Sequence, residues 1–396
     1  LSKNGMGLQK MLDELQMYCQ TNNLKINTDK TQCMIFNKSG RLMRKPFIFN
    51  GILLGNVRKY KYLGFLLTPS GEIKSGLQVL RDRAFKGFMK LKNSLGCAFK
   101  KDILITLHLI DSLIKPILLF SSDFWGCLKL PKSNPIENLD MMMCKQLLGV
   151  QKQTTNLGVL LELGRVPLNI YAAKLSVKNW ERIRQKNCNS LLFESYSNSY
   201  NNHLIWISST QECLERNGMT DLYLNIPENR LLTINKKIFE RLSDSFHQYA
   251  FAEIKKEKSK LRVYANFKEQ IGFEKYLSTM KNPEKRAVIT RFRLSNHKLM
   301  IEVGRHKHIP KQIRFCPFCS DCVETEFHFL FHCPLYRHVR DRFMKDITPT
   351  NPHITYYPDE LKLRYLFLSS NHLFENYIIN LTELRDFLLS HHKRHI

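Results

Sequence analysis

Four residues with metal-binding side chains lie close together in this chain. Cys316 and Cys319 form a Cys-x-x-Cys pair, His328 follows after eight residues, and Cys333 follows after four more. A Cys-x-x-Cys turn presents two thiolates to one ion, and a second pair on a following helix can close a tetrahedral site. Metal binding then contributes on the order of 10 kcal/mol to the folding of a segment too short to bury its own core. We therefore predict a structural Zn²⁺ site with no position open for catalysis.

The identity of the fourth ligand stays open at this point. His332 immediately precedes Cys333, and on an ideal helix it shares a face with His328, four residues earlier. Cys333 shares that face only if the helix ends or distorts there, which Pro334 favours. We expect Cys333 to be the fourth ligand, with His332 as the alternative and Cys322 as a spare thiol. The alternative for the whole cluster is a set of ordinary buried cysteines beside an aromatic-rich helix.

The remaining cysteines and the apolar stretches indicate the cellular environment of the chain. Seven of the 11 cysteines are scattered singly, which is typical of an intracellular, reducing environment and not of a disulfide framework. The most apolar stretch, residues 104–120, is interrupted by His108, Asp111 and Lys115, so we predict no membrane-spanning helix. The chain begins with Leu1 in place of an initiator methionine, and we expect it to be a fragment of a longer protein.

The chain is strongly basic. Its 396 residues include 61 Lys and Arg against 35 Asp and Glu, which gives a formal net charge of +26. A hydrophobic content of 43% excludes a disordered basic tail, and the length suggests two to four units. The partner that most often offsets such a charge is a polyanion, with nucleic acid ahead of an anionic membrane. Residues 21–100 carry +13 and residues 251–320 carry +11, so the surplus lies mainly in two windows.

Hydrophobic periodicity predicts a predominantly α fold. Residues 7–22 have the apolar spacing of one amphipathic helix, Asn50-Gly51 between apolar runs predicts a hairpin, and residues 59–68 predict a strand. From residue 73 onward the pattern is helical, including residues 102–127 and a long helix over 233–267, and the Asn- and Ser-rich stretch 185–202 predicts a linker or long loop. The expected segments are an incomplete α+β unit (1–70), a helical region (71–185), a linker with further helices (186–300), a zinc-knuckle region that holds the Cys and His cluster (301–340) and a helical tail (341–396).

Two groups of cations are candidates for contact with a phosphate backbone, which would give salt-dependent binding with little sequence readout. For any single lysine a solvated helix face is the alternative, so the prediction concerns each group. The first group comprises Arg41, Arg44, Lys45, Arg58, Lys59, Lys61, Arg81, Arg83 and Lys86, and the second comprises Lys255, Lys256, Lys258, Arg291, Arg293 and Arg305.

Several stretches, taken in order, resemble a known family. They are Gly7–Asp13 with Leu24–Thr31, Tyr60–Phe65, Lys115–Phe120 with Trp125-Gly126, Leu147–Val150, Arg291–His297 with Glu302–Arg305, and the Cys-x2-Cys-x8-His-x4-Cys cluster. Together they are similar to the C-terminal part of a non-LTR (LINE-type) retrotransposon reverse transcriptase, from just after its catalytic Tyr-Ala-Asp-Asp strand to its zinc knuckle. The Cys and His cluster is the one specific motif, and the other stretches support the resemblance by their order along the chain.

The resemblance implies an RNA-directed DNA polymerase with RNA template and target DNA as partners. It implies that residues 1–70 end the palm, that 71–185 form a helical thumb, and that 186–300 form a connection. Such polymerases hold Mg²⁺ on palm carboxylates, and the family pattern places these before Leu1, so this chain alone is expected to be inactive. By the same resemblance Lys30 lies near the phosphates of the incoming nucleotide, with a solvated turn lysine as the alternative.

Three functions follow as hypotheses. The first is the nucleic-acid-binding C-terminal part of a retroelement reverse transcriptase, nuclear if it acts in integration. The second is a non-enzymatic nucleic-acid-binding protein derived from such an element. The third is a zinc-stabilised protein-interaction module, in which the basic groups would not bind nucleic acid. A small-molecule substrate is not indicated by any motif.

Overall fold

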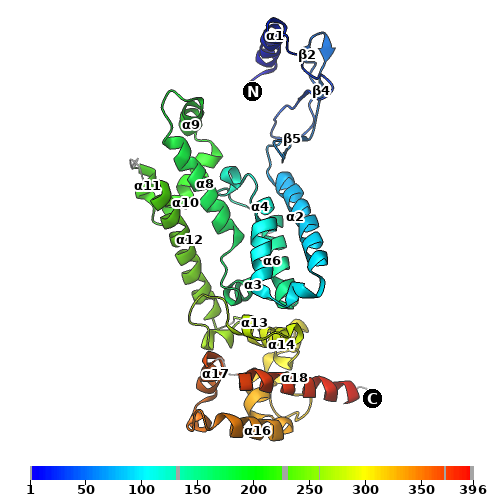
Figure 1. Cartoon of the computed structure of the whole chain (residues 1–396), viewed down its shortest axis with the longest axis vertical. Helices are drawn as coiled ribbons and strands as arrows, with labels where there is room; N and C mark the ends of the chain where they lie inside the picture. Colours follow the sequence, from blue (N-terminus) through cyan, green and yellow to red (C-terminus); the bar gives the residue numbers. More distant parts are fainter. Residues whose placement is uncertain (1, 131–133, 225–230, 258, 370–371, 393–396) are drawn as a thin grey trace. The chain divides into compact units, whose positions relative to one another are not determined.

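The structure is a computed structural model that describes residues 2–130, 134–224, 231–257, 259–369 and 372–392. Helix predominates and strands are few and short, so the predicted mainly α class is confirmed (Figure 1). The chain divides into two compact units, residues 1–86 and 87–396. Among the described residues, no helix has the length and apolar character needed to cross a bilayer.

The first unit is a small α+β structure with a four-residue core. It contains three pairs of short strands. Strands β1 and β4 pair in parallel, whereas β2 with β3 and β5 with β6 form antiparallel hairpins with two-residue turns. Side chains of α1 pack against the core of Cys33, Phe47, Phe49 and Leu54. The elements are α1 (Gly5–Thr21), β1 (Gln32–Cys33), β2 (Ile48–Phe49), β3 (Ile52–Leu53), β4 (Gly55–Asn56), β5 (Tyr60–Tyr62), β6 (Phe65–Leu67) and the start of α2 (Lys74–Leu95).

Two turns shape this unit. The predicted hairpin at Asn50-Gly51 is confirmed, and both residues have positive φ, 49° and 76°, as a tight two-residue turn requires. The single strand expected over residues 59–68 is wrong, because the chain reverses at Leu63-Gly64 and forms the β5–β6 hairpin. Both turn residues again have positive φ, 44° and 93°, a conformation that glycine adopts at no steric cost.

The second unit is helical. Its α-helices are α3 (Ile103–Leu109), α4 (Lys115–Leu118), α5 (Ser122–Trp125), α6 (Pro135–Leu148), α7 (Asn156–Glu162), α8 (Leu168–Arg184), α9 (Leu191–Asn201), α10 (Ile205–Arg216), α11 (Thr220–Leu224), α12 (Leu231–Ile254), α13 (Tyr276–Thr279), α14 (Pro283–Arg293), α15 (Met300–His306), α16 (Arg337–Ile347), α17 (Asp359–Leu368) and α18 (His372–His392). Helix α8 packs against α5, α10 and α12 around the buried Trp180, and α18 packs against α14 and α16 (Figure 1).

Three predicted elements of this unit need correction. The loop expected over residues 185–202 contains α9, which Ser190 caps by accepting from the N–H of Phe193 and which packs Tyr196 against the core. The helix expected over 102–127 is interrupted by a π-helical turn at 110–114 and by Ser121, whose φ is 57°. The helix expected over 233–267 ends at Ile254. At residues 185–202 the composition was misleading. Asn and Ser have a low helix propensity, but the packing of a few apolar side chains such as Tyr196 stabilises the helix all the same.

The contact between α6 and the start of α8 is expected to make the stability of the fold depend on pH. Glu137 of α6 accepts a hydrogen bond of 2.6 Å from the N–H of Asn169, yet burial and the nearby Asp140 raise the pKa of Glu137 to about 7. A carboxyl whose pKa is raised on folding stabilises the folded state below pH 4.5, and that stability is lost as pH rises from about 4.5 to about 7. We expect the loss to be about 2 kcal/mol, since the side chain is only partly buried.

Glu137→Gln tests this assignment because glutamine keeps the accepting oxygen and has no proton to lose. The variant is expected to gain about 2 kcal/mol of unfolding free energy relative to the parent between pH 5 and pH 8. Urea unfolding at each pH, followed by tryptophan fluorescence, measures the difference. A difference that stays constant with pH would show that Glu137 does not titrate in this range.

Candidate metal centre and basic surface

The predicted metal ligands converge on one point in the second unit. One ligand atom from each of Cys316, Cys319, His328 and Cys333 lies within 4.8 Å of the other three. The two sulfurs of Cys316 and Cys333 are 4.0 Å apart, and the Cys319 sulfur lies 3.4 Å from Nε2 of His328. A tetrahedral ion with Zn–S bonds of about 2.3 Å separates two sulfur ligands by about 3.8 Å. Three thiols and an imidazole at this spacing can therefore bind a metal such as zinc.

A short hairpin places the first two thiols. Phe315 and Val323 form an antiparallel bridge, and the N–H of Cys316 donates to the carbonyl of Cys322 at 2.8 Å. The turn closes as the N–H of Ser320, whose φ is 58°, donates to the carbonyl of Cys316. Cys316 and Cys319 thus point to the inside of one tight turn, as the Cys-x-x-Cys spacing requires.

A π-helical turn places the second pair. Residues 328–332 form this turn, and the N–H of Cys333 donates to the carbonyl of His328, five residues earlier, at 2.8 Å. A π turn brings residues five apart onto one face, whereas an α turn does this for residues four apart. Cys333 then leaves the helix with a ψ of 124°, directly before Pro334. The helix is therefore distorted in the way that brings Cys333 onto the same face as His328.

His332 points away from the cluster. Its Nε2 lies 2.5 Å from Oδ2 of Asp359, at the start of α17, and its side chain is 57% exposed. The structure therefore brings together the first predicted ligand set and leaves out His332. Cys322 is exposed and also lies outside the four. Within the described ranges, this cluster is the one group of His, Cys, Asp or Glu with ligand atoms close enough to share an ion.

Burial sets the protonation of these groups in the absence of a cation. It raises the pKa of the Cys316 thiol to about 12 and raises the pKa of Cys333, while it lowers the pKa of His328. Near neutral pH the buried thiols therefore hold their protons. A divalent cation displaces those protons, so metal loading releases protons.

Two buried glutamates connect the cluster to the surrounding helices. Glu324 accepts from the N–H of Met300, at the start of α15, and from both Nε and an Nη of Arg385 on α18, at 2.6 to 2.9 Å. Glu326 accepts two bonds from Arg262 and contacts His297. Burial alone would raise the pKa of Glu326, but His297 and Arg262 lower it to about 2. Residue spacing gives no sign of this role, because Arg262 and Arg385 are far from the cluster in sequence.

The first group of predicted cations lies at the surface of the first unit. Arg81 pairs with Asp82, whereas none of the other cations of this group, nor Lys30, has an acidic partner within the described residues. No acidic residue occurs anywhere in the sequence from Lys30 to Gly71. The exposed cations are Lys30, Arg41, Arg44, Lys45, Arg58, Lys59, Lys61, Arg83 and Lys86, and we call them the basic surface of the first unit.

The second group is divided among buried, paired and exposed cations. Arg293 is 4% exposed and pairs with Glu162 and Glu274, so its assignment to a nucleic-acid surface is wrong: a buried guanidinium cannot reach a phosphate. Arg305 pairs with Glu302, and Lys256 pairs with Glu253. Lys255 and Arg291 are exposed, although Nε of Arg291 donates to the carbonyl of Gly149. Lys258 lies outside the described residues.

Comparison with known proteins identifies no relative of this chain. No family model, no curated protein and no solved structure matches this chain. Its function is therefore argued from the metal centre, the basic surface and the sequence resemblance.

Proposed function

We propose that this chain is the nucleic-acid-binding C-terminal part of a non-LTR retroelement reverse transcriptase, with Zn²⁺ in the Cys316, Cys319, His328 and Cys333 site. It acts inside the cell, and in the nucleus where the element integrates. Residues of the first unit hold RNA template or target DNA by its phosphates. The zinc site stabilises the C-terminal helices and takes no part in chemistry.

The observation that carries the proposal is the unpaired charge of the basic surface of the first unit. A solvated helix face usually alternates both signs of charge, whereas seven of these nine cations, those from Lys30 to Lys61, come from a stretch without acidic residues. Exposed cations of one sign concentrate a polyanion and release its counterions on binding. The polymerase assignment rests on the ordered resemblance, to which the four-ligand cluster contributes the one specific motif.

Removal of four of these cations tests the proposal. Glutamine at Arg44, Lys45, Lys59 and Lys61 is expected to weaken binding of single-stranded RNA or DNA by tenfold or more. It should also reduce the slope of log K against log salt by about 3, because each lost phosphate contact contributes about 0.7 to 0.9. Fluorescence anisotropy over a salt series measures both quantities.

A charge-matched control removes four exposed cations that have acidic partners. Lys236, Lys298, Arg337 and Arg364 pair with Glu240, Asp386, Asp341 and Glu269. Glutamine at these four positions is expected to change the slope by less than about 1. Equal losses in both variants would show that net charge alone drives binding. Failure of the parent chain to bind RNA or DNA even at low salt would contradict both nucleic-acid hypotheses and leave the protein-interaction module.

The coding sequence upstream of Leu1 tests the polymerase assignment separately. An in-frame Tyr-Ala-Asp-Asp there supports a reverse transcriptase. A start codon with its own promoter would instead support a free-standing nucleic-acid-binding protein derived from the element.

A further inference from the structure

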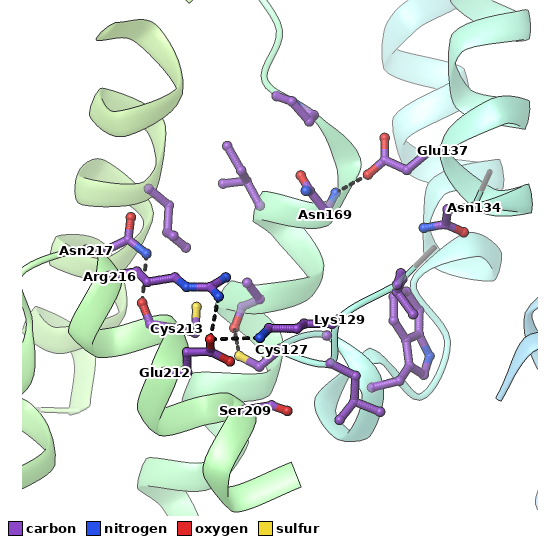
Figure 2. Close-up of a pocket in the computed structure, with 18 residues that line it drawn as sticks. Cys127, Lys129, Asn134, Glu137, Asn169, Ser209, Glu212, Cys213, Arg216 and Asn217 are labelled. Atoms are coloured by element: carbon purple, nitrogen blue, oxygen red, sulfur yellow. Dashed lines mark hydrogen bonds and ion pairs between the residues drawn. The ribbon is translucent and has the colours of Figure 1, made fainter. Parts of the chain in front are cut away.

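Two cysteines that the metal site does not use meet at a cavity in the second unit. Cys127 directly follows α5 and Gly126, and Cys213 lies on α10. Both line a cavity of about 470 Å³ bounded by the ends of α5, α6 and α8 and by α10 (Figure 2). Both residues are partly exposed and line the cavity, so a small molecule that enters the cavity meets them.

Tight packing fixes Cys127 at this place. A side chain at Gly126 would collide with the carbonyl oxygen of Ala172, so glycine allows the end of α5 to lie directly on α8. The Cys127 thiol donates to the carbonyl of Ala173 at 3.8 Å and also interacts with the Cys213 thiol. The two cysteines, far apart in sequence, therefore line one cavity, with Cys127 held against α8 and Cys213 lying on α10 (Figure 2).

The two thiols differ in acidity. The neighbouring Cys127 thiol lowers the pKa of Cys213, and the charge of Arg216 acts in the same direction against the effect of burial. Cys213 and burial both raise the pKa of Cys127. Cys213 is thus the better nucleophile, since the thiolate is the reactive form. Lys129 and Arg216 both pair with Glu212 next to Cys213, so this part of the rim has two cations and one carboxylate, and Glu137 lines another part of the cavity (Figure 2).

We propose that Cys127 and Cys213 are a modification site that forms a reversible disulfide by exchange with an anionic low-molecular-weight disulfide such as oxidised glutathione. The Cys213 thiolate attacks one glutathione sulfur, forms a mixed disulfide and releases one glutathione thiolate. Cys127 loses its proton to solvent and attacks the Cys213 sulfur, which releases the second glutathione. The chain loses two electrons and two protons, and oxidised glutathione is reduced to two thiols.

The product would link the segment after α5 to α10 across the cavity. Both partners already pack on α8, so the link adds a covalent bond to contacts that exist in the reduced protein. A cross-link between distant residues restricts the unfolded chain. We expect the oxidised second unit to unfold at higher urea concentration than the reduced one.

Mass spectrometry of the full, zinc-loaded chain after incubation with oxidised glutathione tests the site. The expected product is a peptide pair joined through Cys127 and Cys213, with a loss of two hydrogen atoms that dithiothreitol reverses. The exposed Cys188 serves as the internal control and should carry a mixed glutathione disulfide. Cys127→Ser should trap one glutathione on Cys213, whereas Cys213→Ser should leave Cys127 unmodified.

The proposal is overturned if Cys188 is glutathionylated while Cys127 and Cys213 stay reduced. It is also overturned if Cys127 and Cys213 react only as separate mixed disulfides. An arsenoxide reagent that requires two neighbouring thiols gives an independent measurement, because it needs no oxidation. On the zinc-loaded chain, mass spectrometry should find the reagent on the Cys127 and Cys213 peptides of the parent and on neither peptide of the single serine variants, and labelling of either peptide in a single variant would contradict the pairing of these thiols.

Discussion

Cys316→Ser combined with Cys319→Ser is expected to abolish metal binding and to unfold the region around the knuckle. The parent should contain one metal ion per chain, and the double variant none, since two remaining ligands cannot hold a closed tetrahedral site. Elemental analysis of the purified chain measures the content and identifies the metal. The lost binding free energy is on the order of 10 kcal/mol, which is comparable to the stability of a whole domain.

The effect should reach beyond the four ligands. Glu324 and Glu326 lie between Cys319 and His328 and hold α15, α18 and Arg262 through buried hydrogen bonds. If the turn loosens, these carboxylates lose their fixed positions, so Arg385 becomes a buried cation without its carboxylate and Arg262 keeps only Glu302. Limited proteolysis should therefore cut the variant within residues 297–392 under conditions that leave the parent intact.

Two neighbouring substitutions serve as controls. Cys322→Ser changes an exposed thiol outside the cluster, and His332→Ala removes a surface pair with Asp359. Both should keep the full metal content, with a stability change below about 1 kcal/mol. Loss of metal in His332→Ala would reinstate this residue as the fourth ligand, and an unchanged metal content in the double serine variant would rule out the site.

Arg293→Ala is expected to cost about 3 to 5 kcal/mol of unfolding free energy. Glu162 is fully buried and accepts from Nε of Arg293 at 2.6 Å and from the hydroxyls of Tyr264 and Tyr276. Removal of the guanidinium leaves this carboxylate without its cation, whereas Glu274 keeps Lys268 as a partner. Urea unfolding by tryptophan fluorescence measures the loss, because all three tryptophans lie in the second unit.

An exposed pair gives the matched comparison. Lys236 and Glu240 are an i, i+4 pair on α12 with mostly exposed side chains, so Lys236→Ala should change stability by less than about 1 kcal/mol. Arg293→Met combined with Glu162→Gln should recover part of the loss, because it removes both charges. A cost below 1 kcal/mol for Arg293→Ala would contradict a structural role and reopen a nucleic-acid role for this residue.

The metal cluster could be predicted because its information is local. Cys-x-x-Cys defines a turn, and His328 and Cys333 complete the ligand count within 18 residues. The choice between Cys333 and His332 was not local, since it depends on a π turn and on Asp359, which lies on another helix. Spacing alone assumes an ideal helix, and the packing around Leu330 and Tyr377, whose hydroxyl donates to the Leu330 carbonyl, is not encoded in that spacing.

The sequence by itself determined the charge surplus, the helical class, the Asn50-Gly51 turn and three of the four candidate metal ligands, because each depends on residue type and short spacing. The tertiary structure alone decided which charges face solvent. Arg262 and Arg293 belong to the same basic window as Lys255, yet they are paired with Glu302, Glu326, Glu162 and Glu274. Burial of a charge requires a partner at hydrogen-bond distance, and these partners are brought close only by folding.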